Sequence, residues 1–185
     1  LGLALAALGV DAMAFSCWKW LLGPLGSGGL YVADSFLKKL DIRVAGTSSV
    51  KNDEVYLPHR EDYKESVERF MLSTAPYMNW VHLEASLRFL DDVGLTTVQE
   101  RLMLLADGIA DALRKAGFTV IRDSFGHDKT SIVCAKKEGD MNELHAKLMK
   151  AGVVCAYREG NLRFSPHLNF TETDLERFAS VIAAQ

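Results

Sequence analysis

The chain has 185 residues, of which 49% are hydrophobic and 24% charged, and its formal net charge is −3. This length and composition allow one or two compact units with real cores, and the interspersed charges predict neither a nucleic-acid partner nor a charged tail. Three scattered cysteines and five histidines without ligand spacing predict no disulfide framework and no metal site, which favours a reducing, cytoplasmic compartment.

The chain opens with an apolar run over residues 1–10. This run has no basic flank, and Asp11 ends it well short of a membrane span, so we expect neither a signal peptide nor a membrane segment. We predict instead a buried helix or turn that leads into a strand over 12–16. The apolar start without a methionine predicts that the chain begins inside a domain.

Lys19 lies between Trp18 and Trp20, just before a Gly-Pro-Leu-Gly turn at residues 23–26. Only the neutral amine of a lysine forms an imine with a carbonyl cofactor, and desolvation by apolar walls favours that neutral form. The two indoles are the expected walls. The alternative is an ordinary snorkelling lysine followed by a glycine-rich hairpin.

The run Ser16-Cys17-Trp18-Lys19 and the turn behind it resemble the class V aminotransferase group of fold-type I pyridoxal-phosphate enzymes. This resemblance implies that Lys19 is the catalytic residue and holds pyridoxal 5'-phosphate as an internal aldimine. It also implies that Ser16 contacts the cofactor phosphate. Trp18 stands where histidine is usual in the family, and its indole N–H can still donate to a phosphate oxygen.

A second stretch, Glu68–Tyr77, resembles the family's Arg-Phe-Glu-x-Gly-Thr-Pro segment. The match makes Thr74 a phosphate contact that is donated across a dimer interface, while Ser73 replaces the expected glycine. The alternative role of Ser73 or Thr74 is to cap a helix predicted from about Met78 to Val93. Both roles are compatible, because a helix N-terminus is itself an anion site.

Other signals in the first half predict shorter elements. We expect a strand over 29–33, a short helix over 35–39, and a polar loop over 44–65 that covers the active face. The first 94 residues therefore follow the pattern of an α/β layer.

The second half carries clearer signals. Thr97 and Glu100 predict a capping box for a helix that stops at Gly117. Further on we expect strands over 118–122, 131–136, 153–157 and 162–164, a helix from Asp140 with Glu143 as its box partner, and a last helix over 172–183. This pattern predicts an α+β domain over 95–185 with helices on one face of a mostly antiparallel sheet.

The stretch Tyr157–Asn169 resembles the family's closing Arg-x-Gly-x-x-Arg-x-Ser pattern. By this resemblance Arg163 binds the substrate carboxylate, a role that suits the two parallel N–H donors of a guanidinium. The alternative is a strand arginine paired with a surface acid such as Glu159. No cysteine lies between Arg158 and Arg163, and Cys155 is expected on a strand, which argues against a cysteine desulfurase.

Taken together, the resemblance implies an α/β fold: part of a fold-type I large domain over 1–94, followed by the small α+β domain over 95–185. It implies an aminotransferase-like homodimer that acts on an amino acid, with a kynureninase-like lyase or an epimerase as alternatives. The family's first half, including the aspartate that keeps the ring nitrogen charged, has no counterpart here. We therefore expect Lys19 alone to give only slow, weak chemistry and the chain by itself to be inactive as a turnover catalyst.

A second hypothesis is a folded interaction or dimerisation module in which Lys19 has no catalytic role. Exposed apolar surface distinguishes the two hypotheses. A part of a larger domain exposes an apolar patch around residues 1–35, whereas a module that stands alone has a polar cover there.

Overall fold

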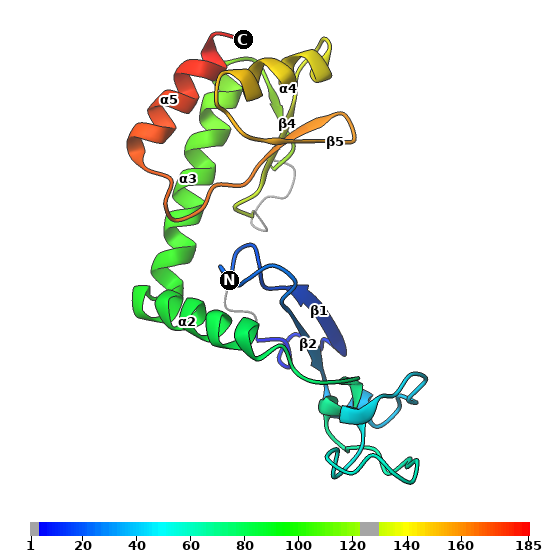
Figure 1. Cartoon of the computed structure of the whole chain (residues 1–185). Coiled ribbons are helices and arrows are strands. Elements are labelled where there is room, and N and C mark those ends of the chain that lie inside the picture. The colour runs from blue at the N-terminus through cyan, green and yellow to red at the C-terminus, as the bar shows by residue number, and fades with distance from the viewer. Residues whose placement is uncertain (1–3, 123–129) are drawn as a thin grey trace. The chain divides into compact units, whose positions relative to one another are not determined.

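The computed structural model describes residues 4–122 and 130–185 (Figure 1). The chain divides into two compact units, and the boundary between them in the sequence falls between Val93 and Gly94. Gly94 is the single residue between helix α2 (Tyr77–Val93) and helix α3 (Leu95–Lys115), and its φ of 89° is a conformation that favours glycine.

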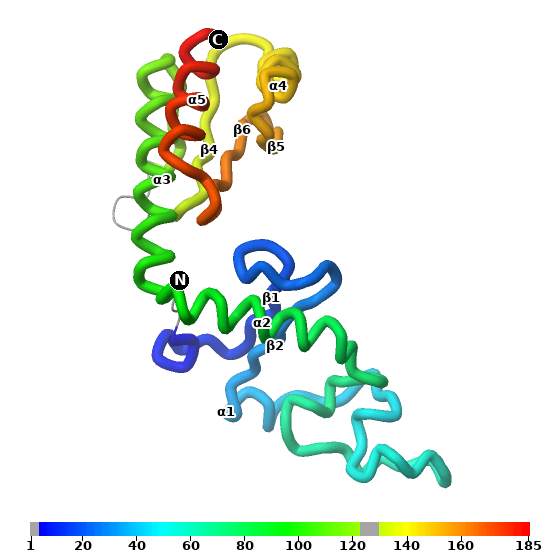
Figure 2. The backbone as a smooth tube through the Cα atoms, turned by 60° about the vertical axis from the view of Figure 1, so that its left-hand side comes forward, coloured from blue at the N-terminus to red at the C-terminus, as the bar shows by residue number. Residues whose placement is uncertain are grey.

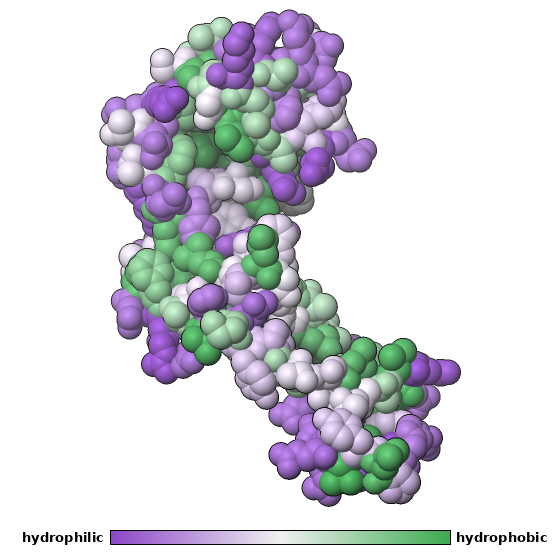
Figure 3. Space-filling view, in the orientation of Figure 1, coloured by the Kyte–Doolittle hydropathy of each residue, from purple (hydrophilic) through white to green (hydrophobic). Residues whose placement is uncertain are grey.

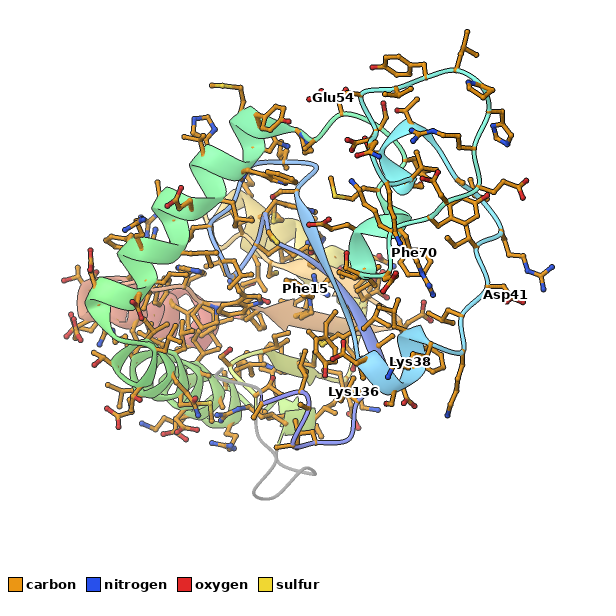
Figure 4. All side chains as sticks on the ribbon, turned by 90° about the horizontal axis from the view of Figure 1, so that it is seen from below. Phe15, Lys38, Asp41, Glu54, Phe70 and Lys136 are labelled. Carbon is orange, nitrogen blue, oxygen red and sulfur yellow. The ribbon has the colours of Figure 1, made fainter. Side chains whose placement is uncertain are left out.

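The first unit is built on a two-stranded antiparallel ribbon. Strand β1 (Ala12–Ser16) pairs with β2 (Gly28–Val32), and Phe15 lies opposite Gly29. The other elements of this unit are α1 (Asp34–Leu37), the short 3-10 helices η1 (Thr47–Ser49) and η2 (Val67–Phe70), and α2. Figure 4 labels Phe15 on the ribbon and Phe70 in η2.

The first unit has little core of its own. Among its described residues, the buried apolar side chains are Cys17, Leu37, Val50 and Leu90. The expectation of a real core is therefore wrong for this half, because a two-stranded ribbon and one long helix are too thin to bury their apolar faces. The opening run is also not buried: it forms a turn in which Leu8 is 63% exposed, and residues 1–3 lie outside the described part.

The second unit has a four-stranded antiparallel sheet in the order β3-β4-β6-β5. Its strands are β3 (Thr119–Val120), β4 (Val133–Lys136), β5 (Ala156–Arg158) and β6 (Asn161–Phe164). Its other helices are α4 (Met141–Lys150) and α5 (Glu172–Ala183). Helices α3 and α5 lie side by side, as Figure 2 shows.

The core of the second unit lies between one face of this sheet and the helices. Val133, Ala135 and Leu162 of the sheet are fully buried there, together with Leu148 of α4 and Ile182 of α5. Strand residues alternate between the two faces of a sheet, so Cys134 and Arg163 point away from this core. The predicted helices on one face of a mostly antiparallel sheet are confirmed.

Two predicted capping boxes differ from the structure. Helix α3 begins at Leu95, so Thr97 lies inside its first turn and is not the N-cap; Gly94 occupies that position. Asp140 caps α4 as predicted, since its carboxylate accepts from Asn142 N at 2.8 Å. The Glu143 carboxylate, however, forms an ion pair with Lys147, its neighbour one helical turn later.

Candidate functional site

The turn between β1 and β2, which carries Lys19, is held by main-chain hydrogen bonds. Cys17 N donates to Ser27 O at 3.0 Å, and Gly23 N donates to Cys17 O at 2.9 Å. A Cβ on Gly23 would lie 2.9 Å from both Cys17 O and the side chain of Leu83, so only glycine fits there. These two hydrogen bonds and the close approach at Gly23 fix the conformation of the turn.

Helix α2 supports the same turn from the side. Ser86 Oγ donates to Leu22 O at 2.9 Å, and the Asn79 amide donates to Leu25 O at 3.4 Å. Leu22 itself has a φ of 57°, which is strained for a leucine. These contacts from a long helix hold that strained conformation in place.

An open hollow lies over the ribbon beside the turn. Ser16, Trp18, Ser27, Gly28 and Gly29 are among its lining residues. Phe15 lies opposite Gly29, and a Cβ on Gly29 would lie 2.4 Å from Phe15 Cζ, so the phenyl ring covers this glycine and forms part of the lining. Two of the predicted cofactor contacts, Ser16 and Trp18, are thus brought together.

Lys19 lies next to this hollow but does not line it. Its side chain is exposed, and Nζ lies 4.7 Å from the centroid of the Trp18 ring. The expected enclosure of Lys19 between two apolar walls is therefore wrong for this chain. A cation on an indole face is a favourable contact that positions the amine beside the hollow.

Thr74 lies in a bend three residues before α2 begins at Tyr77. Its side chain is exposed, and within residues 4–122 and 130–185 no hydrogen bond involves its hydroxyl. The alternative role of Ser73 or Thr74 as helix cap is not seen in the described part of the chain. Thr74 does not line the hollow that contains Ser16 and Trp18.

The predicted loop over 44–65 is attached firmly at its start. Ser49 is fully buried in η1, where its hydroxyl accepts from Gly46 N and donates to Met71 O, both at 3.0 Å. A Cβ on Gly46 would lie 1.9 Å from Leu72 O. These contacts fix the segment just before Thr74, and sequence reasoning missed Ser49 because its partner is 22 residues away.

Arg69 fixes the same segment from the other side. Its Nη2 donates to Leu37 O at 2.5 Å and to Leu40 O at 2.8 Å, at the end of α1. The arginine of the family-like Arg-Phe stretch therefore has a structural role here.

Arg163 lies in the second unit, in a hollow on the sheet face opposite the core. Arg122, Cys134, Arg158 and Asn161 line the same hollow. In the part of the chain that the structure describes, Arg163 has no acidic partner, so the alternative pairing with Glu159 is not seen. Asn161 Oδ1 is buried there without a hydrogen-bond donor.

The three cysteines are free thiols in different surroundings. Cys155 precedes β5 and is not on a strand, and burial raises the pKa of its thiol to about 11, so it is protonated at neutral pH. Burial also raises the pKa of Cys17. Cys134 lies directly opposite Arg163 in the β4–β6 register, a neighbour that no local sequence signal reveals.

Two negative findings concern the described residues alone. No helix there is long and apolar enough to cross a membrane. No group of three or more histidine, cysteine or acidic side chains in those residues is arranged to hold a metal ion.

Comparison with known proteins assigns the family. The family model for aminotransferase class V matches residues 2–178, so the chain belongs to the class V aminotransferase family. An uncharacterized aminotransferase of Schizosaccharomyces pombe is 29% identical over 95% of the chain and 45% of its own length. A second, uncharacterized protein of the same yeast is 30% identical over 95% of the chain and 41% of its own length.

Solved structures share the fold. A cysteine desulfurase from Thermococcus onnurineus superposes with a TM-score of 0.84 at 20% identity, over 97% of this chain and 48% of that one. A cystine C-S lyase in complex with cysteine persulfide superposes with a TM-score of 0.85 at 19% identity. The match covers 99% of this chain and 49% of that one. The fold is thus that of fold-type I enzymes, and the chain spans about half the length of the proteins that it matches.

Pyridoxal phosphate is the cofactor of this family. The donor set beside the β1–β2 turn fits it: the Ser16 hydroxyl and the Trp18 indole N–H can donate to phosphate oxygens, and Lys19 supplies an amine.

Proposed function

We propose that this chain is the cofactor-attaching and substrate-clamping part of an aminotransferase-like enzyme that acts on an amino acid. Residues 1–94 form part of its large, cofactor-binding domain and residues 95–185 its small domain. The observation that carries the proposal is the placement of an exposed lysine on Trp18, beside the hollow that Ser16 and the β2 glycines line.

Pyridoxal phosphate, when bound, withdraws electrons from the bonds at the Cα of an attached amino acid. The residues of this chain bind and orient around it. Ser16 and Trp18 would hold its phosphate by hydrogen bonds, and Lys19 would supply the amine that attaches it. The neutral amine of Lys19 would also serve as the general base that takes or returns the Cα proton of the amino acid.

Arg163 orients the amino acid by its carboxylate. Its guanidinium is not neutralised by any acid in the described part of the chain, so its N–H donors are available to a ligand. Two parallel N–H···O contacts fix both position and plane of a carboxylate, which one lysine ammonium cannot do.

Thr74 is proposed to contact the cofactor of a second copy of the chain. Its hydroxyl is exposed, it does not line the hollow of its own ribbon, and the contacts of Ser49 and Arg69 hold the segment that carries it. This role requires a homodimer. Trp80, Val81 and Phe89 of α2 are exposed apolar side chains that a second copy could cover. Figure 3 shows hydrophobic surface on the first unit.

The reaction outcome separates an aminotransferase from a kynureninase-like lyase or an epimerase of the same fold. The test is a single-turnover reaction of the cofactor-loaded chain with an amino acid, followed by chromatography of the products. We expect a slow reaction that yields a 2-oxo acid and the aminated cofactor, with none from Lys19→Ala. A D-amino acid or side-chain cleavage would indicate one of the alternatives, and an unchanged amino acid would contradict the proposal.

A further inference from the structure

The sheet of the second unit presents one face without cover from its own helices. Val133, Ala135 and Leu162 point to the core with zero exposure, so the residues that alternate with them point the other way. Cys134, Asn161 and Arg163 occupy that open face and line the hollow described above, together with the apolar side chains of Ile121 and Ile132.

Two of the three arginines of this hollow are available to a ligand. Arg122 is 2% exposed, forms an ion pair with Asp107, and donates through Nε to Thr130 O at 2.7 Å. Arg158 and Arg163 are exposed, and neither has an acidic partner in the described ranges 4–122 and 130–185. In those ranges Arg158 donates one hydrogen bond, from Nη1 to the carbonyl of its neighbour Tyr157 at 3.0 Å.

The register places these two guanidinium groups within reach of a single small molecule. Arg158 pairs with Asn161 across the β5–β6 hairpin, and Arg163 follows two residues later on the same face. Diagonal neighbours of this kind in an antiparallel pair lie roughly 7–8 Å apart. Flexible arginine side chains span that separation easily, so both can contact one ligand that has an acidic group at each end.

We infer that this hollow selects amino acids whose side chain ends in an acidic group, with Arg163 on the α-carboxylate and Arg158 on the side-chain acid. The inference rests on the proposed function, in which Arg163 binds the substrate carboxylate. Arg158 is then a specificity-determining residue. The apolar walls from Ile121 and Ile132 suit the methylene carbons between two acidic groups.

The test compares L-glutamate with L-glutamine, which has the same shape and a neutral side chain. Titration calorimetry of the whole chain at low ionic strength is expected to show glutamate binding about tenfold more tightly, the ratio that one charge-assisted hydrogen bond supports. Arg158→Gln is expected to abolish this preference by weakening glutamate binding alone. Arg158 and Arg163 are exposed, so we expect substitution of either residue to leave the fold intact.

Lys136→Gln is the matched control. Lys136 lies on the same face of β4 and has no ion pair in the described residues, but it does not line the hollow. We expect this variant to keep the preference for glutamate. Equal affinities in the unsubstituted chain, undetectable binding of both amino acids, or an equal loss in Lys136→Gln would each overturn the inference.

Arg163→Gln separates the inference from the proposed function. If Arg163 is the carboxylate clamp, this variant loses affinity for glutamate and glutamine alike. Suppose that Arg163→Gln keeps glutamine binding while Arg158→Gln still removes the glutamate preference. Then the proposed carboxylate-binding role of Arg163 is wrong, and the role of Arg158 in selecting an acidic side chain stands. Suppose instead that Arg163→Gln weakens the binding of both amino acids and Arg158→Gln changes neither affinity. Then the carboxylate-binding role of Arg163 stands, and the inferred selectivity of Arg158 is wrong.

Discussion

Ser49 is the residue that connects the polar loop to the segment before Thr74. Its hydroxyl replaces water for two main-chain groups at once, Gly46 N and Met71 O, and the side chain is fully buried. A buried group that loses its partner pays its full desolvation cost. The position proposed for Thr74 therefore depends on this hydroxyl, which lies 25 residues earlier in the chain, together with the contacts of Arg69.

Ser49→Ala is expected to destabilise this attachment by about 1 kcal/mol, because it removes the hydrogen-bond partner of two half-buried main-chain groups, Gly46 N and Met71 O. Hydrogen exchange followed by mass spectrometry measures the effect, with faster exchange over 44–73 as the expected result. The neighbour Ser48 is less buried, and its hydroxyl forms no hydrogen bond within the described residues, so Ser48→Ala is the control variant. Equal exchange in both variants would mean that the Ser49 hydroxyl does not fix the segment.

At the scale of the element, the last helix follows its sequence signals closely. The capping box of Thr171 and Asp174 and the apolar spacing of Phe178 and Ile182 all lie within twelve neighbouring residues, and the predicted bounds of α5 are confirmed. Local signals of this kind are sufficient because both partners are close in sequence.

Other elements depended on contacts that are distant in sequence. Helix α3 starts two residues before Thr97 because Gly94 turns the chain directly after α2. In the candidate site too, the sequence predicted local groupings but not contacts between residues distant in sequence. The motif around Lys19 predicted the grouping of Ser16 and Trp18, whereas Cys134 opposite Arg163 follows from a strand register that joins residues 29 apart.

The cap of α5 makes a prediction about pH. Hydrogen bonds from Thr171 N and Oγ1 lower the pKa of Asp174. A carboxyl whose pKa is lower in the folded state stabilises that state above its unfolded pKa, near 3.9, and the stabilisation disappears as the pH falls through the folded pKa. Asp174→Asn is therefore expected to be less stable than the unsubstituted chain at pH 7 and to approach it below about pH 3.

Thr171→Ala removes the reciprocal half of the same box. Loss of an N-cap hydroxyl costs about 1 kcal/mol, so this variant is expected to lower the urea midpoint of the second unit. Urea unfolding at several pH values measures both variants. A difference between Asp174→Asn and the unsubstituted chain that does not change with pH would contradict the electrostatic part of this account.

At the scale of the whole molecule, the two units differ in their cores. The second unit has a continuous cluster of buried side chains drawn from helices and sheet, whereas the first exposes apolar side chains such as Phe15, Trp18, Leu25 and Leu30. This exposure around residues 1–35 is what the sequence predicts for a part of a larger domain.

Separate expression of the two units tests this contrast. Residues 94–185 are expected to unfold cooperatively and to give dispersed NMR spectra, because their core is complete among themselves. Residues 1–93 are expected to stay unfolded or to associate, since their apolar surface lacks cover. A cooperative, monomeric first unit would contradict the assignment of this half to a larger domain.

The central claim is that Lys19 attaches pyridoxal phosphate, and reductive trapping tests it most directly. The chain is mixed with pyridoxal phosphate, reduced with borohydride and mapped by peptide mass spectrometry, with Lys19→Ala beside Lys38→Ala, a second exposed lysine of the same unit. We predict one cofactor adduct on the peptide that contains Lys19, lost in Lys19→Ala and kept in Lys38→Ala. Labelling spread over surface lysines, and equal in both variants, would contradict the claim.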